Sequence, residues 1–229
     1  MPFNDRSEAG KRLAVALEAY RGERPVILAL PRGGVPVAAE IATALDAPLD
    51  LILVRKVGVP FQPELAMGAV VDGGKPIIVR NEDVIGSIGV SEADFQSVCQ
   101  KELAEVERRR QRYLGNRAPV DVTDRTVIVV DDGLATGATT RAALRAIWRR
   151  RPRKVVLAVP VAPSDTLADM RAEADDVVCL ESYEFFGAIG AYYVDFNQVS
   201  DEEVTTALAA AAKAGASGGG RNGGREIAR

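Results

Sequence analysis

One segment near the middle of the chain reads Val127-Ile128-Val129-Val130-Asp131-Asp132-Gly133-Leu134-Ala135-Thr136-Gly137-Ala138-Thr139-Thr140. Its four leading apolar residues are β-branched, which predicts a strand that is covered on both faces, and residues 141–148 then show helical periodicity. The turn between them therefore lies at the carboxyl edge of a parallel sheet, where open α/β folds bind ligands. The segment predicts an α/β fold with a ligand site at this turn.

The residue types in the turn suit a sugar phosphate. The amides of residues 136–140 lie at a helix start, where unpaired N–H groups and the helix dipole attract an anion. Gly137 allows close backbone approach, and Thr136, Thr139 and Thr140 add hydroxyl donors. Asp131 and Asp132 cannot bind phosphate, but their oxygens suit ribose hydroxyls or a hydrated magnesium ion.

The segment resembles the phosphoribosyl pyrophosphate (PRPP) signature of the type I phosphoribosyltransferases over the strand, both acids and the whole turn. The resemblance implies an open, mainly parallel twisted sheet that is flanked by helices and carries a small C-terminal hood. It also implies Mg²⁺ near Asp131 and Asp132, held through water, and it assigns the PRPP 5-phosphate to Ala135, Thr136, Gly137, Ala138, Thr139 and Thr140. A Walker A loop is disfavoured because Ala138 precedes Thr139 where that motif needs a Lys.

Two further stretches resemble the same family. The strand at 25–30 leads into Pro31-Arg32-Gly33-Gly34, similar to the family's pyrophosphate loop, and the resemblance implies a cis peptide between Pro31 and Arg32. The strand at 50–54 leads into Arg55-Lys56, similar to the pair by which several members hold pyrophosphate. We predict that these strand ends converge on one mouth, with Arg32, Arg55, Lys56, Asp131 and Asp132 as catalytic residues. A solvated strand end is the alternative for Arg55-Lys56.

Two segments are candidates for covering the ligand. Residues 57–65 lie where the family has its mobile catalytic loop. Residues 183–196 concentrate aromatic side chains in a chain with only 5% of them, which suggests a lid over a flat acceptor. The family's hood stacks a ring on the nucleobase, and Phe185 or Phe186 is the candidate here, with Asp195 or backbone groups reading the edge of the base. Equally, these rings close the sheet edge or form a dimer contact.

Composition restricts the chemistry. The 229 residues, 47% of them hydrophobic, are enough for one substantial core. The chain contains no His, which excludes Ser-His-Asp triads and His general bases. Its two cysteines, Cys99 and Cys179, make no CxxC motif, so we expect both to pack rather than bind zinc. A net charge of -3 gives no global attraction to nucleic acid. The lack of a signal-peptide core or a membrane span favours a cytoplasmic protein.

The remaining elements alternate strand and helix. We interpret residues 1–214 as one phosphoribosyltransferase domain with the hood mainly at 181–199 and a possible inserted helix at 91–115, and residues 215–229 as a flexible, Gly-rich tail. We interpret the basic run 108–112 as a solvated helix face. The pattern predicts a helix at 14–20, a hairpin of 66–71 with 76–79 around 72–74, a helix capped by Ser91, strands at 155–159 and 177–180, a helix starting near Ser164, and a last helix whose capping box is Ser200 and Glu203.

The resemblance, which covers residues 24–200, implies Mg-dependent transfer of 5-phosphoribosyl from PRPP to a nucleobase-like or amine acceptor in a homodimer. Members that act on 6-oxopurines carry an Asp where this chain has Ala135, so hypoxanthine and guanine are disfavoured. Two alternatives remain open. One is a regulator that senses PRPP or binds nucleic acid with weak or no catalysis, and the other is a hydrolase or phosphorylase that uses the same pocket.

Overall fold

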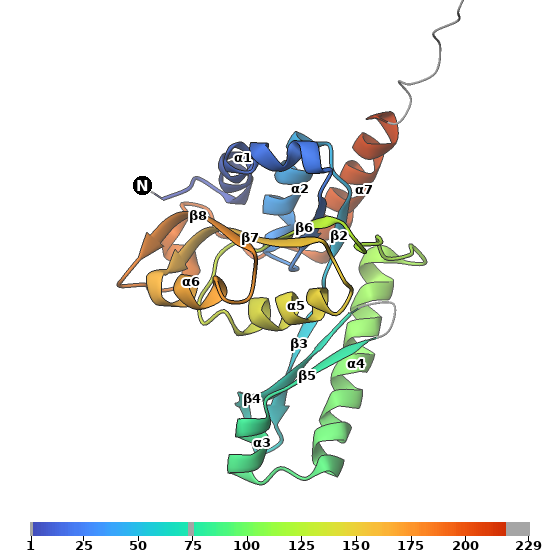
Figure 1. The fold of residues 1–229 in the computed structure, drawn as a ribbon, viewed down its shortest axis with the longest axis vertical. Helices are drawn as coiled ribbons and strands as arrows, with labels where there is room; N and C mark the ends of the chain where they lie inside the picture. Colours follow the sequence, from blue (N-terminus) through green and yellow to red (C-terminus); the bar gives the residue numbers. More distant parts are fainter. Residues whose placement is uncertain (1, 73–75, 219–229) are drawn as a thin grey trace, which may run out of the picture.

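A five-stranded parallel sheet forms the centre of the molecule. The computed structural model describes residues 2–72 and 76–218, and the sheet has the strand order β2-β1-β6-β7-β8 (Figure 1). Every neighbouring pair in it is parallel, which confirms the predicted mainly parallel sheet. Its strands are β1 (Val26–Ala29), β2 (Leu49–Leu51), β6 (Thr126–Val130), β7 (Lys154–Pro163) and β8 (Asp176–Tyr183).

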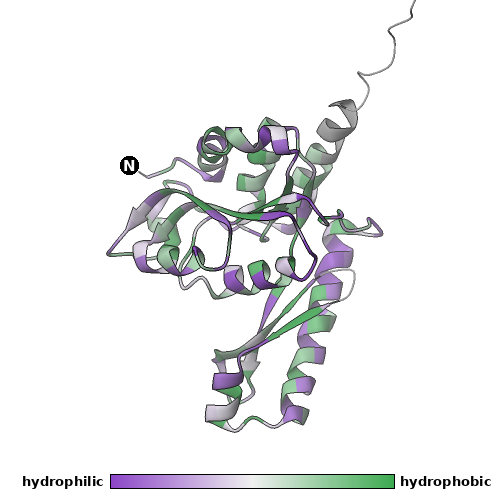
Figure 2. Cartoon of the chain, in the orientation of Figure 1, coloured by the Kyte–Doolittle hydropathy of each residue, from purple (hydrophilic) through white to green (hydrophobic). Residues whose placement is uncertain are grey.

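Helices cover both faces of this sheet. Figure 1 shows α1, α2 and α7 above it and α5 and α6 below it. Along β6, Ile128 and Val130 pack into the upper core while Val127 and Val129 pack into the lower one, which explains the unbroken apolar run. In Figure 2 the strands of this sheet are mostly green, and helices such as α1 and α5 show both green and purple residues. The helices are α1 (Arg6–Ala16), α2 (Gly34–Leu45), α5 (Ala138–Trp148), α6 (Ser164–Met170) and α7 (Asp201–Gly218), with short 3-10 helices η1 (Glu18–Glu23) and η2 (Ile189–Tyr192).

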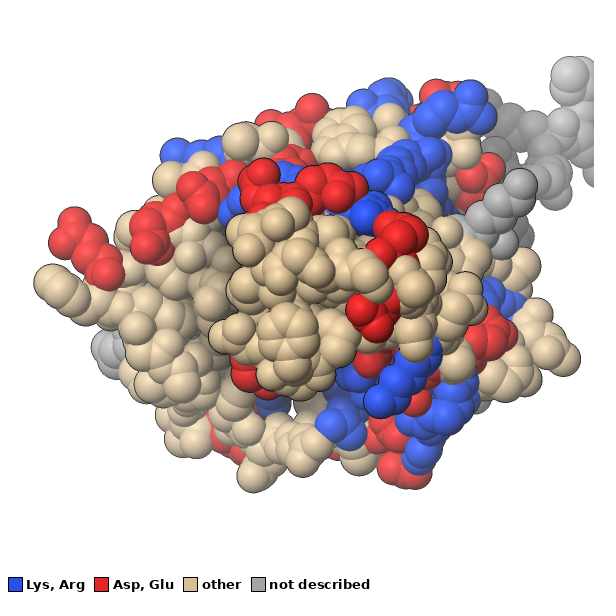
Figure 3. All heavy atoms as spheres, turned by 90° about the horizontal axis from the view of Figure 1, so that it is seen from below, with Lys and Arg blue, Asp and Glu red and all other residues tan. Residues whose placement is uncertain are grey.

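A second, antiparallel sheet projects from the first with two helices, and we call this part the arm (Figure 1). It contains β3 (Val54–Val59), β4 (Gln62–Val71), β5 (Ile77–Arg80), α3 (Glu82–Ile88) and α4 (Glu92–Leu114). The predicted hairpin is confirmed as β4 and β5, although residues 73–75 of its turn lie outside the described residues. Seen along the arm from below, charged side chains border an uncharged centre above and on the right (Figure 3). Phe61, between β3 and β4, is exposed.

Two predictions for this region are wrong. Residues 57–65 do not form a loop, because β3 continues to Val59 and β4 begins at Gln62. Arg55 and Lys56 do not end a strand of the central sheet but lie inside β3, opposite Val70 and Ala69 of β4. The physical reason is that β4 supplies an antiparallel partner, which keeps the chain extended past the point where β2 ends.

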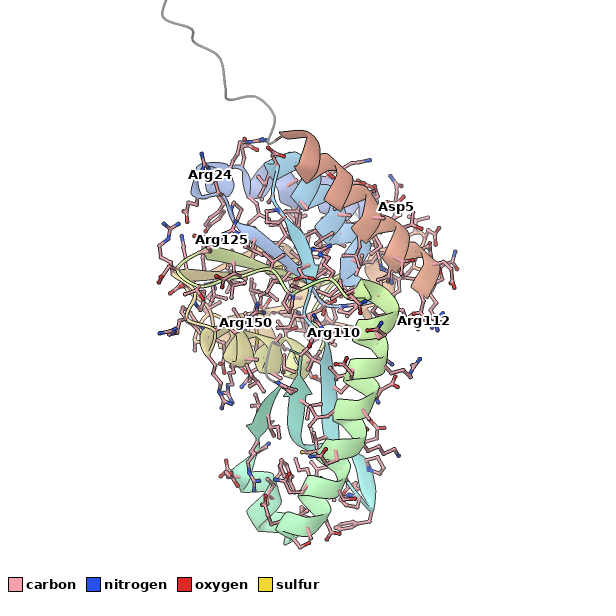
Figure 4. All side chains as sticks on the ribbon, turned by 90° about the vertical axis from the view of Figure 1, so that its right-hand side faces the viewer. Asp5, Arg24, Arg110, Arg112, Arg125 and Arg150 are labelled. Atoms are coloured by element: carbon pink, nitrogen blue, oxygen red, sulfur yellow. The ribbon has the colours of Figure 1, made fainter. Side chains whose placement is uncertain are left out.

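The long helix α4 begins at the predicted cap. The Ser91 hydroxyl accepts a hydrogen bond from the Asp94 amide at 3.1 Å. The basic run 108–112 is only partly a solvated face, since Arg110 is 16% exposed and its guanidinium lies 2.9 Å from the Asp72 carboxylate. Arg112 instead lies on the side of α4 toward α7 (Figure 4). Arg110 therefore joins α4 to the end of β4 within the arm, and Arg112 joins the arm to α7.

The ends of the chain also depart from the prediction. The first helix begins at Arg6, earlier than the predicted 14–20, because Asp5 caps it by accepting a hydrogen bond from the Glu8 amide at 2.8 Å. The Ser200 and Glu203 capping box is confirmed. Helix α7 extends to Gly218, past the predicted start of the tail at residue 215, and residues 219–229 lie outside the described residues.

Two smaller expectations concern the cysteines and the membrane. Cys99 is buried in α4 and Cys179 lies in β8, as expected for packing residues, and burial raises the pKa of both thiols. No helix within residues 2–72 and 76–218 combines the length and the apolar character that crossing a membrane requires.

Candidate active site

The two carboxylates lie at the carboxyl end of β6, as predicted. The Asp132 side chain is enclosed, with 8% of the residue exposed, and Asp131 is half-buried. The Asp132 amide donates a hydrogen bond of 2.9 Å to the Asp131 carboxylate. Enclosure by protein raises the pKa of Asp131 well above its usual range, and the neighbouring Asp132 carboxylate raises it further. Asp131 therefore holds its proton more strongly than an exposed aspartate does.

The segment that follows β1, residues 31–34, lies directly against these acids, and we call it the glycine loop. A Cβ atom on Gly33 would lie 2.0 Å from an Asp132 carboxylate oxygen. A Cβ atom on Gly34 would lie 2.7 Å from the Val130 carbonyl oxygen and 2.9 Å from the Asp131 Cα. Both glycines are thus required for the two strand ends to approach each other. The Pro31–Arg32 peptide bond is cis, which confirms that expectation.

Arg32 and Asp132 share a cavity of about 470 Å³ at this edge of the sheet, which we call the acid cavity. The Arg32 guanidinium lies 3.8 Å from the carboxylate of Asp201, the first residue of α7. The cavity therefore combines side chains from β6, the glycine loop, the N-terminal helix and the segment before α7. Its lining residues are Arg6, Arg32, Gly33, Asp132, Ile189, Phe196, Gln198 and Val199.

Residues 135–140, which we call the threonine turn, form the end of the connection after β6 and the first residues of α5. Gly137 has a φ of 69°, in the left-handed region that favours glycine, and directly precedes the helix. The turn is anchored because the Thr166 hydroxyl donates a hydrogen bond to the Ala135 carbonyl at 3.0 Å. Thr136, Ala138 and Thr139 are exposed, whereas Thr140 is buried. The first amides of α5 lack intrahelical partners by geometry, so the turn presents donors of the predicted kind.

Arg55 and Lys56 do not share the acid cavity. They line a separate one of about 370 Å³ between β3, β4 and α4. The Arg55 guanidinium lies 2.7 Å from the Glu102 carboxylate, and the Lys56 ammonium lies 3.1 Å from that of Glu64. The predicted convergence of three strand ends therefore holds for two of them. The segment with Arg55 and Lys56 does not converge there, because it pairs with β4 in the arm instead of ending beside the acids.

The hood segment, residues 181–199, covers the acid cavity with different residues from those predicted. Phe185 is 93% exposed, and Phe186 stacks on Tyr192 with ring centroids 4.8 Å apart. The Asp195 carboxylate accepts a hydrogen bond from the Asn197 amide. Ile189 and Phe196 line the cavity instead. The aromatic cluster in the sequence pointed to this segment but could not tell which rings face inward.

Sequence reasoning also missed two residues that hold the second acid. The Arg6 Nε donates a hydrogen bond of 2.8 Å to an Asp132 carboxylate oxygen, and the Tyr193 hydroxyl donates one of 2.6 Å to the Asp132 carbonyl. Burial raises the pKa of Tyr193, so its hydroxyl keeps its proton. Arg6 lies 126 positions from Asp132, and no local pattern links the two residues.

Comparison with known proteins identifies the family of this chain. A protein-family model described as the phosphoribosyl transferase domain matches residues 7–197. The chain belongs to this phosphoribosyltransferase family. The crystal structure of TT1426 from Thermus thermophilus is similar at 42% identity with a TM-score of 0.80, covering 91% of this chain and 98% of that one.

Curated relatives agree. The protein named "Putative phosphoribosyl transferase Rv0571c" from Mycobacterium tuberculosis is 46% identical over 209 residues, which are 91% of this chain and 47% of that protein. This phosphoribosyltransferase chain thus spans about half the length of that relative. A shorter match, 56% identical over 48 residues, covers 20% of the chain and 27% of the "Bifunctional protein PyrR" of Latilactobacillus sakei.

The donor set of this phosphoribosyltransferase fits Mg²⁺. Within the described ranges, no cluster of three or more His, Cys, Asp and Glu side chains is arranged to hold a metal ion by itself. The ion prefers to keep several waters and to bind one or two carboxylates together with substrate oxygens. Asp131 and Asp132 supply two carboxylates at the carboxyl end of β6, which is the number that a magnesium ion bound to substrate oxygens takes from a protein.

Proposed function

We propose that the chain transfers the 5-phosphoribosyl group of PRPP to a nitrogenous acceptor, with release of pyrophosphate and dependence on Mg²⁺. The observation that carries the proposal is the close approach of the glycine loop to the acid pair, where a Cβ atom on Gly33 would lie 2.0 Å from Asp132. This contact supports the proposal because it brings the residues proposed to bind pyrophosphate next to those proposed to bind the ribose. The threonine turn, which follows the two acids in the chain, adds a phosphate cradle.

Different groups of residues then bind the three parts of PRPP. Amides and hydroxyls of the threonine turn hold the 5-phosphate, and Asp131 and Asp132 hold the ribose hydroxyls. Arg32 and the glycine loop hold the pyrophosphate, to which Arg32 presents a planar fork of donors. Mg²⁺, held by Asp131 and Asp132 through water, would neutralise charge on the pyrophosphate oxygens.

The reaction is a displacement at ribose C1. The acceptor nitrogen supplies the electron pair of the new bond to C1, pyrophosphate leaves with the pair of the broken C1–O bond, and the acceptor proton passes to solvent. This chain contributes positioning and electrostatic stabilisation, which require no His. Phe185, Phe186 and Asp195 keep their predicted role at the acceptor as a hypothesis, with Ile189 and Phe196 as the residues that line the acid cavity.

The first experiment is a pyrophosphate-release assay with PRPP and Mg²⁺ against a panel of bases and small amines. Its test variant is Asp131→Asn/Asp132→Asn, and its control is Asp46→Asn, which changes an exposed acid at the end of α2. We expect acceptor-dependent release in the wild type and the control, and its loss in the double variant.

Other outcomes separate the alternatives. Tight PRPP binding without release on any acceptor would favour the PRPP-sensing regulator, and release that needs no acceptor would favour a hydrolase. A wild type that does not bind PRPP would overturn the proposal. An Arg55→Gln/Lys56→Gln variant tests the pair in the arm, which is predicted to contact pyrophosphate. If the pair makes this contact, removing both charges lowers the affinity for PRPP. Light scattering tests the predicted homodimer.

A further inference from the structure

Arg6, in the N-terminal helix α1, contributes a cation to the acid cavity. Its side chain is 11% exposed. The guanidinium lies 3.8 Å from the centre of the Phe196 ring, its Nε donates to Asp132, and its Nη1 donates to the Asn197 carbonyl at 2.9 Å. The group is therefore fixed in position by a ring, a carboxylate and a backbone oxygen.

The backbone before Arg6 is held equally firmly. The Phe3 amide donates to the Tyr192 carbonyl, and the Phe3 carbonyl accepts from the Val194 amide, both at 2.8 Å. The Phe3 side chain is fully buried and its ring lies 5.4 Å from that of Tyr193. The N-terminal segment thus pairs with the hood segment, so the position of Arg6 in the cavity is fixed by the fold.

The donors of Arg6 exceed what the protein uses. A guanidinium has five N–H donors and accepts nothing. Two of the five have the partners named above, and three have no hydrogen-bond partner among the residues that the structure describes. An enclosed guanidinium with spare donors is suited to a planar, anionic group, above all a carboxylate.

The lining of the cavity favours the same ligand. Each of its two cations pairs with one carboxylate, Arg6 with Asp132 and Arg32 with Asp201, and the spare donors of Arg6 remain. Ile189, Phe196 and Val199 supply apolar walls, and Gln198 supplies the remaining side-chain amide. Spare N–H donors therefore lie beside an apolar surface. A neutral base, whose edge presents donors as well as acceptors, would leave several of these N–H groups unpaired.

We propose that Arg6 selects the acceptor, and that the acceptor is a flat nitrogen heterocycle carrying a carboxylate. The inference rests on the proposed function, because it assigns the acid cavity to the acceptor of that reaction. The carboxylate accepts the spare donors of Arg6 and takes no part in the bond changes at C1. Arg6 would then set which heterocycle is oriented with its nitrogen toward the ribose.

Matched probe pairs that differ in charge test the proposal. They are pyridine-3-carboxylate with pyridine-3-carboxamide, and uracil-6-carboxylate with uracil. Affinities for the full chain are measured by calorimetry with and without saturating Mg²⁺ and PRPP, and pyrophosphate release is followed for the same four compounds. We expect the wild type to bind at least one carboxylate about 10- to 100-fold more tightly than its neutral partner, which is the effect of one or two charge-assisted hydrogen bonds.

Three variants assign the preference to Arg6. Arg6→Gln removes the charge and is expected to abolish the preference, while Arg6→Lys keeps the charge and is expected to retain part of it. Arg12→Gln is the matched control, because Arg12 also lies on α1 and over an aromatic ring but pairs with Glu181 and does not line the cavity. Thermal unfolding of each variant verifies that it is folded.

The outcomes separate this inference from the proposed function. Binding of PRPP by the wild type with equal affinities within both probe pairs overturns the role of Arg6 and leaves the transferase intact. A carboxylate preference that Arg6→Gln removes, in a chain that does not bind PRPP, supports the anion site and overturns the transferase. Equal loss of preference in Arg6→Gln and Arg12→Gln, or no binding of either carboxylate, overturns the inference.

Discussion

The guanidinium of Arg32 lies 3.8 Å from the carboxylate of Asp201, which joins the glycine loop to the first turn of α7. The same carboxylate accepts a hydrogen bond of 2.5 Å from the Tyr113 hydroxyl and lies 2.9 Å from the Arg112 guanidinium. These contacts hold the pKa of Asp201 below its usual range, with the Tyr113 hydrogen bond as the largest cause. One ionised carboxylate thus links the candidate site, the arm and the last helix.

The first prediction concerns this link. In the proposed reaction, Asp201→Asn should raise the KM for PRPP by about 2- to 5-fold with a smaller effect on kcat, because Arg32 loses the ion pair that holds its side chain in position. The effect is modest because both partners of this ion pair are partly exposed. Steady-state kinetics with varied PRPP measure the change. Glu202→Gln is the control, because Glu202 contacts Arg112 but does not touch Arg32. An equal change in both variants would show that the loss belongs to α7 as a whole.

The second prediction concerns the pH dependence of stability. The pKa of Asp131 is raised in the folded protein, so its ionisation destabilises the fold as the pH rises above the unfolded value of about 3.9. Asp131→Asn should therefore raise Tm at pH 7 by a few degrees, where about 1 kcal/mol corresponds to about 2–4 °C. Below the unfolded pKa the gain should disappear, because Asp131 is protonated in both states. Melting curves across this range measure it, and a gain that is independent of pH would refute the assignment.

The third prediction concerns the contact between the glycine loop and β6. Gly34→Ala should destabilise the protein by roughly 1–3 kcal/mol, because its Cβ atom would lie 2.7 Å from the Val130 carbonyl, a backbone atom that cannot rotate away. Gly22→Ala is the matched control, since its Cβ atom would have no neighbour within 4 Å. Urea titration compares the two. Equal stabilities of the Gly34→Ala and Gly22→Ala variants would mean that the glycine loop moves away from β6 more easily than their packing implies.

The fourth prediction concerns the contact between α4 and the residue that follows β4. Arg110→Ala should cost about 2–4 kcal/mol, because it removes a cation paired with the enclosed Asp72 carboxylate together with a hydrogen bond to the Arg117 carbonyl. Arg108→Ala, two residues away, should leave the unfolding midpoint unchanged, since Arg108 pairs with Glu105 on the same exposed face. Chemical denaturation distinguishes the two arginines, and equal midpoints would contradict the structural role of Arg110.

Local sequence pattern determines much of this protein. The apolar run of β6 predicts a strand covered on both faces, and Ser91, Ser200 and Glu203 mark helix starts correctly. The acids and the threonine turn can be predicted from sequence because β6, the turn and α5 follow one another without a break. Strand periodicity, helix caps and glycine at positive φ all depend on neighbours a few positions away.

Contacts between distant segments are decided by the tertiary structure alone. Arg55 and Lys56 resemble a strand end in the sequence, and the partner that places them in the arm is β4. Phe185 and Phe196 are equivalent as residues in the sequence, yet only Phe196 lines the acid cavity. Arg6 meets Asp132 across 126 positions. The sequence by itself determined the strand, the turn and the helix around Asp131 and Asp132, because these elements are local. Which side chains surround the two acids depends on packing among segments that are far apart in the chain, and the folded structure alone settles it.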